Sequence, residues 1–247
     1  MRILLTNDDG IEAPGLKALM EILGPLHDVW IVAPENEKSG SSHSITLRDS
    51  IRVRKIQDRR FSCRGNPVDC VMVALLGLLP KGIEMVISGI NHGPNLGTDI
   101  LYSGTASAAS QAVLMGVPSA AVSIGSYAPP FDFAGAAAFM ARNLALFREL
   151  SDDDHFLNIN YPNAPGRKPD NVITFPSRRI YRDELHTYEA PNKDVFCFIG
   201  GPIPDSHLEE GSDCQILAQG KVSISPIRVH PANCGSIEEQ YRSVKFL

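Results

Sequence analysis

Apolar segments of strand length alternate with amphipathic segments of helix length over the first two thirds of the chain. Residues 3–6, 29–33 and 85–88 are short and almost continuously apolar, which is typical of strands buried on both faces. Helix-length segments separate them, including residues 14–23, with proline at the start, and 67–79. This alternation predicts an α/β fold with a doubly wound parallel sheet, covered by helices on both faces.

Residues 105–115 form a predicted helix of alanine, serine and valine, whose small side chains would let it pack close to the sheet. Residues 89–103 are rich in glycine and asparagine and are expected to lack regular structure. The other predicted elements are a helix, two strands and a hairpin beside the main sheet: 131–149, 119–124, 156–159, and 51–56 with 60–63.

The pattern changes after residue 162, where prolines and glycines become dense and the apolar runs shorten. We therefore expect a single domain that consists of a doubly wound core, 1–162, and a β-rich extension, 163–247. The extension would include exposed arms and a tail around residues 237–246. Because strands that reach away from a core commonly pair with another subunit, a homo-oligomer is expected.

Composition narrows the classes of function. The 247 residues are 43% hydrophobic and 21% charged, as in ordinary globular proteins, and 23 basic residues against 28 acidic ones give a net charge of -5. This balance disfavours binding of long nucleic acid but allows a small phosphorylated substrate. No apolar run is long enough to span a bilayer and no signal-peptide pattern occurs, so we expect a cytoplasmic protein without a membrane partner.

Three polar segments follow three predicted strands, at residues 6–10, 37–41 and 88–95. Since ligands bind at the carboxyl ends of parallel strands, these segments are expected to converge. The adjacent carboxylates of Asp8 and Asp9 would repel each other unless a cation lies beside them. Residues 7–10 also read as an ordinary turn with solvated acids, but their place directly after the first strand favours a metal site.

Ser39 and Asn91 are the candidate neutral ligands, and a site made of oxygen donors suits Mg²⁺ or Mn²⁺. Two carboxylates already balance a divalent cation, so a phosphate group would need further hydrogen-bond donors. The predicted helix start at Ser103, Gly104 and Thr105 offers backbone N–H groups and hydroxyls, although such residues also serve as simple helix caps. Asn95 and Gly97 line the same loop and offer further donors to the phosphate. The weaker candidates for contacts with substrate or another subunit are His43, His92, Arg178, Arg179, Tyr181 and Tyr188.

At these residues the sequence resembles the SurE family of survival proteins, the 5′/3′-nucleotidases. The resemblance is carried by residues 1–10, 39–40, 65–71, 88–97 with positions 92 and 96 variable, 102–105, 212–213 and 222–227. It implies a Rossmann-like three-layer α/β/α sandwich with exchanged C-terminal arms, in a homodimer or homotetramer. It also implies one divalent cation per subunit on Asp8, Asp9, Ser39 and Asn91, and hydrolysis of nucleoside 5′- and 3′-monophosphates, sometimes also of polyphosphate. This chain departs from the family at Asn66, Ala106 and Gln111, which leaves substrate preference open.

Two other functions remain open, namely a nucleotide sensor without catalysis and an enzyme that acts mainly on polyphosphate.

The catalytic role of Asp8 and Asp9 also has two interpretations. They could hold the metal that assists an attacking water, or one of them could form an aspartyl phosphate. Contiguous side chains diverge, whereas the D-x-D spacing of aspartyl-phosphate enzymes aims both acids at one point, so the metal reading is favoured.

Overall fold

A single mixed sheet forms the centre of the computed structural model, which describes residues 1–231 and residue 242. The predicted tail at 237–246 lies outside the described residues, except for Arg242. The nine strands run in the order β3 (Val53–Gln57), β4 (Arg60–Cys63), β2 (Asp28–Pro34), β1 (Arg2–Thr6), β5 (Met85–Asn91), β6 (Ser119–Gly125), β7 (His155–Pro162), β13 (Val222–Arg228) and β8 (Asn171–Ile173).

The six strands from β4 to β7 are parallel to one another, while β3 and β13 run antiparallel to their neighbours β4 and β7. β1 pairs with β2 on one side, with Ile3 opposite Val29, and with β5 on the other, with Ile3 opposite Met85. The chain therefore reverses its direction of travel across the sheet at β1. In open α/β sheets this switch point is where the carboxyl ends of the strands leave a crevice for a ligand.

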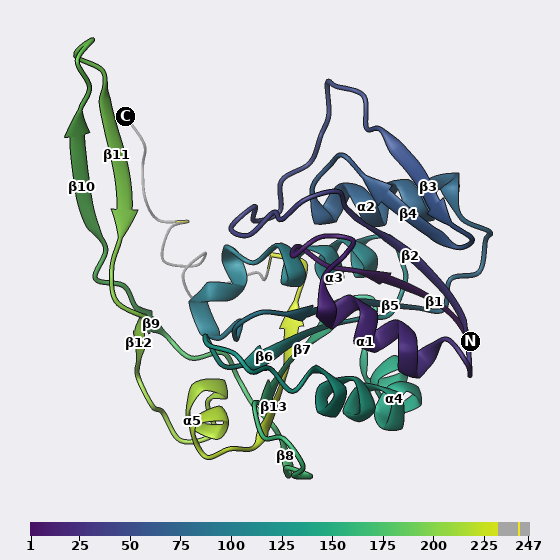
Figure 1. Ribbon diagram of the computed structural model, residues 1–247. Coiled ribbons are helices and arrows are strands. Elements are labelled where there is room, and N and C mark those ends of the chain that lie inside the picture. The colour runs from purple at the N-terminus through teal and green to yellow at the C-terminus, as the bar shows by residue number, and fades with distance from the viewer. Residues whose placement is uncertain (232–241, 243–247) are drawn as a thin grey trace.

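Helices cover both faces of the sheet (Figure 1). α1 (Pro14–Leu23) and α4 (Phe133–Leu150) pack together on one face, and α2 (Pro67–Val73) and α3 (Gly104–Leu114) on the other. The first pair buries long side chains such as Leu19 and Leu144, whereas α3 contributes small residues such as Ala108 and Ala112. The predicted three-layer α/β/α sandwich is confirmed. Within the described residues, no helix combines the length and the apolar character that a membrane span requires.

Three local predictions were wrong. The predicted hairpin is not beside the sheet but forms its edge, because β4 pairs in parallel with β2. The helix predicted for residues 67–79 ends at Val73 and is followed by a π-helical turn, Ala74–Leu78, in which Gly77 has non-helical backbone angles. The segment 89–103 is partly regular, because pairing with β6 extends β5 to Asn91 and a 3₁₀ helix, η2, forms at Gly97–Leu101.

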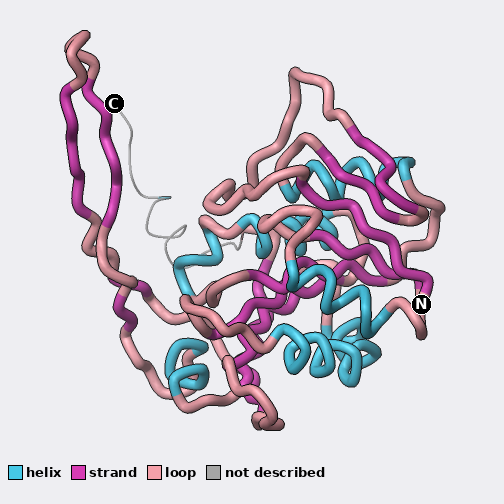
Figure 2. Tube along the Cα trace, viewed as in Figure 1, coloured by secondary structure: helices cyan, strands magenta, loops and turns pink. Residues whose placement is uncertain are grey.

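The described part of the extension, residues 163–231, contributes its first and last strands to the sheet. After β8 the chain forms β9 (Arg179–Ile180), then a long arm of β10 (Glu184–Glu189) and β11 (Val195–Gly200), and then β12 (Asp205–Ser206). It continues through α5 (Asp213–Ala218) and returns as β13 beside β7. Figures 1 and 2 show the arm projecting from the body as a two-stranded ribbon that turns at its far end. The predicted division at residue 162 stays a prediction.

A buried carboxylate attaches the extension to the core. Asp213, whose side chain is inaccessible to solvent, accepts hydrogen bonds from the backbone N–H groups of Gly97 (2.7 Å) and Ser177 (2.9 Å). Gly97 approaches Ser177 so closely that a Cβ there would lie 1.9 Å from the Ser177 carbonyl oxygen. The contact between η2 and the extension therefore depends on the absence of a side chain at Gly97 and on the carboxylate of Asp213 as hydrogen-bond acceptor.

We expect Asp213→Ala to lower the free energy of unfolding by on the order of 2 to 5 kcal/mol, because it leaves two buried N–H groups without acceptors. Urea denaturation followed by circular dichroism measures the change. Asp183→Ala, at an exposed position of the same extension, is the matched control and should change the stability by less than about 0.5 kcal/mol. Equal stability of the two variants would contradict the anchoring role of Asp213.

Candidate functional site

The predicted polar segments line one hollow of about 340 Å³ at the carboxyl edge of the sheet. Asp8 comes from the loop after β1, Ser39 from the loop after β2, and Asn91 from the end of β5. Asn95 and Ser103 line the same hollow. The other three predicted site residues lie within two positions of a lining residue without forming part of the lining: Asp9, Gly104 and Thr105.

Asp8 is held at the start of α3. Its side chain is buried, with 4% of the residue exposed, and its carboxylate accepts hydrogen bonds from the Thr105 backbone N–H (3.1 Å) and the Thr105 hydroxyl. Burial raises the pKa of Asp8 above its usual value, although the hydrogen bonds from Thr105 oppose that shift. The positive end of the helix dipole also favours an anion at this place.

Gly104 makes this approach possible. A Cβ at Gly104 would lie 2.8 Å from the Ser41 hydroxyl oxygen and 2.9 Å from the Asp8 Cβ. Ser103 caps α3, because its hydroxyl oxygen accepts a hydrogen bond from the Ala106 N–H (3.0 Å). The first turn of α3 therefore fits closely against Asp8, and the phosphate-binding roles predicted for Gly104 and Thr105 stay predictions.

Asp9 is buried differently. One carboxylate oxygen, Oδ1, lies 2.9 Å from Nδ1 of His92, while the buried Oδ2 has no hydrogen-bond partner among the described residues. Burial and the neighbouring Asp8 charge raise the pKa of Asp9 to about 6, despite the opposing effect of His92. An unpartnered carboxylate oxygen at low exposure is costly unless a cation satisfies it, so this pair of acids fits a divalent metal ion.

Ser39 and Asn91 are the predicted neutral ligands, and they differ in how firmly they are held. Asn91 Nδ2 donates to the backbone carbonyl of Gly93 (2.8 Å), which orients the amide so that Oδ1 is the atom able to coordinate a cation. The Ser39 hydroxyl donates to Glu37 Oε1 (2.8 Å) in an exposed part of its loop. The metal-binding roles of both residues stay predictions.

Asn95 is fixed by the strands beneath it. Its side-chain Nδ2 donates to the Ser123 hydroxyl of β6 (2.9 Å), and its backbone N–H donates to Asn160 Oδ1 of β7 (2.8 Å). The Asn95 carbonyl in turn accepts from Nδ2 of Asn158 (2.8 Å) and of Asn160 (3.0 Å). This network holds one wall of the hollow in place.

Residues that sequence analysis missed, most of them aromatic, also line the hollow. Tyr102, Tyr127 and Asp99 line it together with Tyr181, one of the predicted candidates. The Tyr181 hydroxyl donates to Asp99 Oδ1 (2.5 Å), and burial followed by this carboxylate raises the pKa of Tyr181. Arg179, whose side chain is 4% exposed, places Nε 3.0 Å from Asp99 Oδ2.

Other weaker candidates lie elsewhere. The ring nitrogen Nε2 of His43 lies 2.9 Å from Gln111 Oε1, and His43 lines a separate hollow. Tyr188 is 65% exposed on the arm, and Arg178 is exposed outside the lining. His92 is the one histidine of the two that enters the site.

The sequence and the fold are both similar to those of known proteins. Residues 3–183 match the family described as Survival protein SurE. The chain belongs to the SurE family. A relative from Geotalea uraniireducens, named 5′-nucleotidase SurE, is 40% identical over 96% of each chain, and one of the same name from Syntrophomonas wolfei is 41% identical over 98% of this chain and 94% of its own. The crystal structure of the SurE protein from Aquifex aeolicus superposes with a TM-score of 0.84 at 32% identity, covering 98% of this chain and 99% of that one.

The burial of Asp9 predicts a pH-dependent stability in the absence of metal. Because the folded-state pKa of about 6 exceeds the ordinary value of 3.8, the folded state prefers the protonated acid, and stability falls as the pH rises from about 4 to above 6. We expect the free energy of unfolding of Asp9→Asn to exceed that of the wild type by on the order of 3 kcal/mol at pH 8 in chelator. At pH 4 the two free energies should differ little. Asp58→Asn, at a carboxylate whose side chain is 83% exposed, is the control. If the difference in free energy of unfolding between Asp9→Asn and the wild type were the same at every pH, the raised pKa of Asp9 would be contradicted.

Proposed function

We propose that this SurE family member is a metal-dependent phosphatase of nucleoside monophosphates, a 5′-nucleotidase like the relatives that it resembles. One observation carries the proposal. A buried carboxylate pair, in which Asp9 Oδ2 has no hydrogen-bond partner among the described residues, adjoins a hollow that tyrosine rings also line. The carboxylates suit a cation that binds a phosphoryl group, and the tyrosine rings suit a planar base.

Asp8, Asp9, Ser39 and Asn91 would hold one Mg²⁺ or Mn²⁺. Such a cation supplies positive charge that polarises a phosphoryl oxygen and favours ionisation of the attacking water. Hydrolysis forms a bond from the water oxygen to phosphorus and breaks the bond from phosphorus to the ribose oxygen, which takes up a proton.

Hydrogen-bond donors must then orient the phosphate, because two carboxylates balance the charge of the cation. Asn95 and Ser103 line the hollow and are the side chains in our proposal that face the phosphoryl oxygens. Gly104 and Thr105 act mainly through Asp8, since the Thr105 hydroxyl and N–H both donate to it. The helix start would thus stabilise the anionic metal ligand as well as the bound phosphate.

The tyrosine side chains that line the hollow favour a nucleotide over a chain of phosphates as substrate. Tyr102 and Tyr181 lie edge to face, with ring centroids 6.0 Å apart, and Tyr102 keeps 55% of its surface exposed. The Asp99 carboxylate in the same wall would repel additional phosphate groups, although Arg179 offsets part of its charge. Both features support a substrate with one phosphate and one base, and polyphosphate is the second candidate substrate.

We expect the purified protein to release phosphate from AMP, GMP and their 3′ isomers with Mn²⁺ or Mg²⁺, and to stop in chelator. Asp8→Asn should lower kcat/KM by about a hundredfold or more, the size typical of losing a group that stabilises charge in the transition state. Asp58→Asn is the control. Tight AMP binding without turnover would favour the sensor, a higher kcat/KM for polyphosphate would favour the polyphosphatase, and a trapped phosphoaspartate would replace the metal-assisted water.

The arm supports the proposal of a homodimer or homotetramer. Within the described part of the chain, β10 and β11 pair only with each other, with Leu185 opposite Ile199 and His186 opposite Phe198. Both faces of the ribbon therefore carry exposed apolar side chains. Ile199 is 80% exposed and Phe198 57%. An isolated two-stranded ribbon is only marginally stable in water, and an apolar surface of this kind is typical of an interface.

Phe198→Glu is therefore expected to shift the protein from an oligomer towards a monomer, because a carboxylate on the ribbon would have to lose its hydration in an interface. Light scattering coupled to size-exclusion chromatography measures the mass. Leu47→Glu makes the same chemical change at a residue on the body that is 82% exposed, and should leave the mass unchanged. A monomeric wild type, or an oligomeric Phe198→Glu protein, would argue against the arm as the interface.

A further inference from the structure

His92 connects the metal-binding acids to a part of the protein that lies outside the predicted ligands. Its Nδ1 lies 2.9 Å from Asp9 Oδ1, and its ring lies against two aromatic side chains. The centroid distances are 5.3 Å to Phe131, in a stacked arrangement, and 5.2 Å to Phe133, in a tilted one. The side chain is 35% exposed and lines the hollow.

The chemistry of the contact fixes which group donates. An ionised carboxylate carries no hydrogen, so in this 2.9 Å contact Nδ1 of His92 is the group that can supply one to Asp9 Oδ1. The contact restrains the orientation of the Asp9 carboxylate at one of its two oxygens. The other oxygen, Oδ2, is the buried atom without a hydrogen-bond partner among the described residues. His92 therefore determines which oxygen of Asp9 is left for a cation.

Asp8 has no comparable freedom. Its Oδ1 accepts from the Thr105 hydroxyl and its Oδ2 from the Thr105 N–H, so two donors from the rigid start of α3 hold it. Asp9 is contacted by the ring and by the backbone of one loop residue, His92. The position of His92 consequently matters more for Asp9 than the position of either Thr105 donor does for Asp8.

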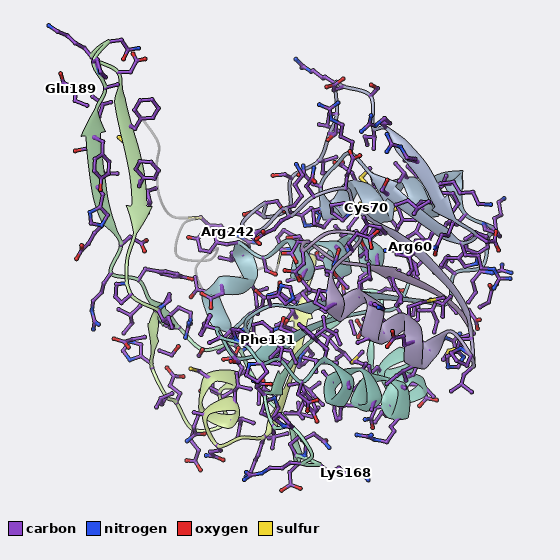
Figure 3. The ribbon with its side chains drawn as sticks, viewed as in Figure 1. Arg60, Cys70, Phe131, Lys168, Glu189 and Arg242 are labelled. Atoms are coloured by element: carbon purple, nitrogen blue, oxygen red, sulfur yellow. The ribbon has the colours of Figure 1, made fainter. Side chains whose placement is uncertain are left out.

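The aromatic pair that holds His92 is itself anchored. Phe131 and Phe133 pack against the main core, and Figure 3 shows the labelled Phe131 in the body of the molecule, away from the arm. Between them Asp132 caps α4 by accepting from the Gly135 N–H (2.9 Å), and its own N–H donates to Asn163 Oδ1 (2.8 Å). The start of α4 and the end of β7 thereby fix the ring of His92.

We propose that His92 is a positioning residue that sets the affinity of the Asp8 and Asp9 pair for a divalent cation. Held against Phe131 and Phe133, it fixes the Asp9 carboxylate so that Oδ2 faces the cation. The inference rests on the proposed metal-dependent function. Hydrogen-bond partners of metal ligands typically contribute 10- to 100-fold to metal affinity, and His92 has this relation to Asp9.

The test compares Mn²⁺ binding to the full-length wild type and to variants by isothermal titration calorimetry, starting from protein freed of metal. His92→Phe and His92→Leu both remove the donor, and each should weaken Mn²⁺ binding by about 10- to 100-fold. His92→Asn is the matched variant, since its Nδ2 can replace the imidazole Nδ1 as donor, and it should stay within about threefold of the wild type. Phe131→Ala keeps the donor but removes its support and should give an intermediate loss.

A second readout separates positioning from a general loss of structure. The Mn²⁺ concentration for half-maximal AMP hydrolysis should rise by the same factor as the dissociation constant, while kcat at saturating Mn²⁺ stays within about threefold of the wild type. Thermal melts in chelator identify any variant that fails to fold. If either His92→Phe or His92→Leu fails to fold, the other still tests the proposal.

The possible failures are distinguishable. If the wild type itself binds no Mn²⁺, the proposed function fails together with the inference. If the wild type binds Mn²⁺ and folded donor-free variants bind it equally well, only the role of His92 is overturned. The same conclusion follows if His92→Asn binds as weakly as His92→Phe, because the donor would then not be the cause.

Discussion

Two neighbouring carboxylates are buried at the end of β1, and much of the surrounding structure is arranged to hold them there. Burial disfavours the charged form of both acids, as the raised pKa values of Asp8 and Asp9 indicate. Asp8 is held by the start of α3, and Asp9 by His92. The compact first turn of α3 is necessary because Gly104 lies against Asp8 with no space for a side chain. The small residues of the rest of α3 then let the helix lie close to the sheet.

The switch in strand order explains why this charge lies beside a hollow. β1 has β2 on one side and β5 on the other, so the loops leaving these three strands open at one edge. The loop after β5 is further fixed by Asn158 and Asn160 of β7, which hold the backbone of Asn95. The parallel order of the sheet thus determines the position of the site, and polar side chains on neighbouring strands determine its rigidity.

Sequence reasoning succeeded where local pattern controls structure. The apolar run before Asp8 identifies the strand end, and the same logic places Ser39, Asn91, Asn95 and Ser103 at one edge, where all of them line the hollow. It could not find contacts between distant segments. The partner of Asp99 is Tyr181, 82 positions later, and the aromatic support of His92 comes from the loop before α4.

Local pattern was also misleading where tertiary pairing prevailed. The glycine and asparagine content of residues 89–103 predicts a segment without regular structure, but pairing with β6 extends β5 to Asn91 and η2 forms at Gly97–Leu101. The edge position of the β3 and β4 hairpin likewise depends on β2, which lies earlier in the chain. Propensity describes a segment in isolation, whereas hydrogen bonding to a neighbouring strand decides its final state.

The short strands β9 and β12 support both the arm and the wall of the hollow. They pair antiparallel, with Ile180 opposite Asp205, at the base from which the arm extends. Tyr181 directly follows β9 and Pro204 directly precedes β12, and both residues form part of the wall of the hollow. The direction of the arm and the shape of the hollow therefore depend on the same strand pair, and a substitution that distorts this pair alters both together.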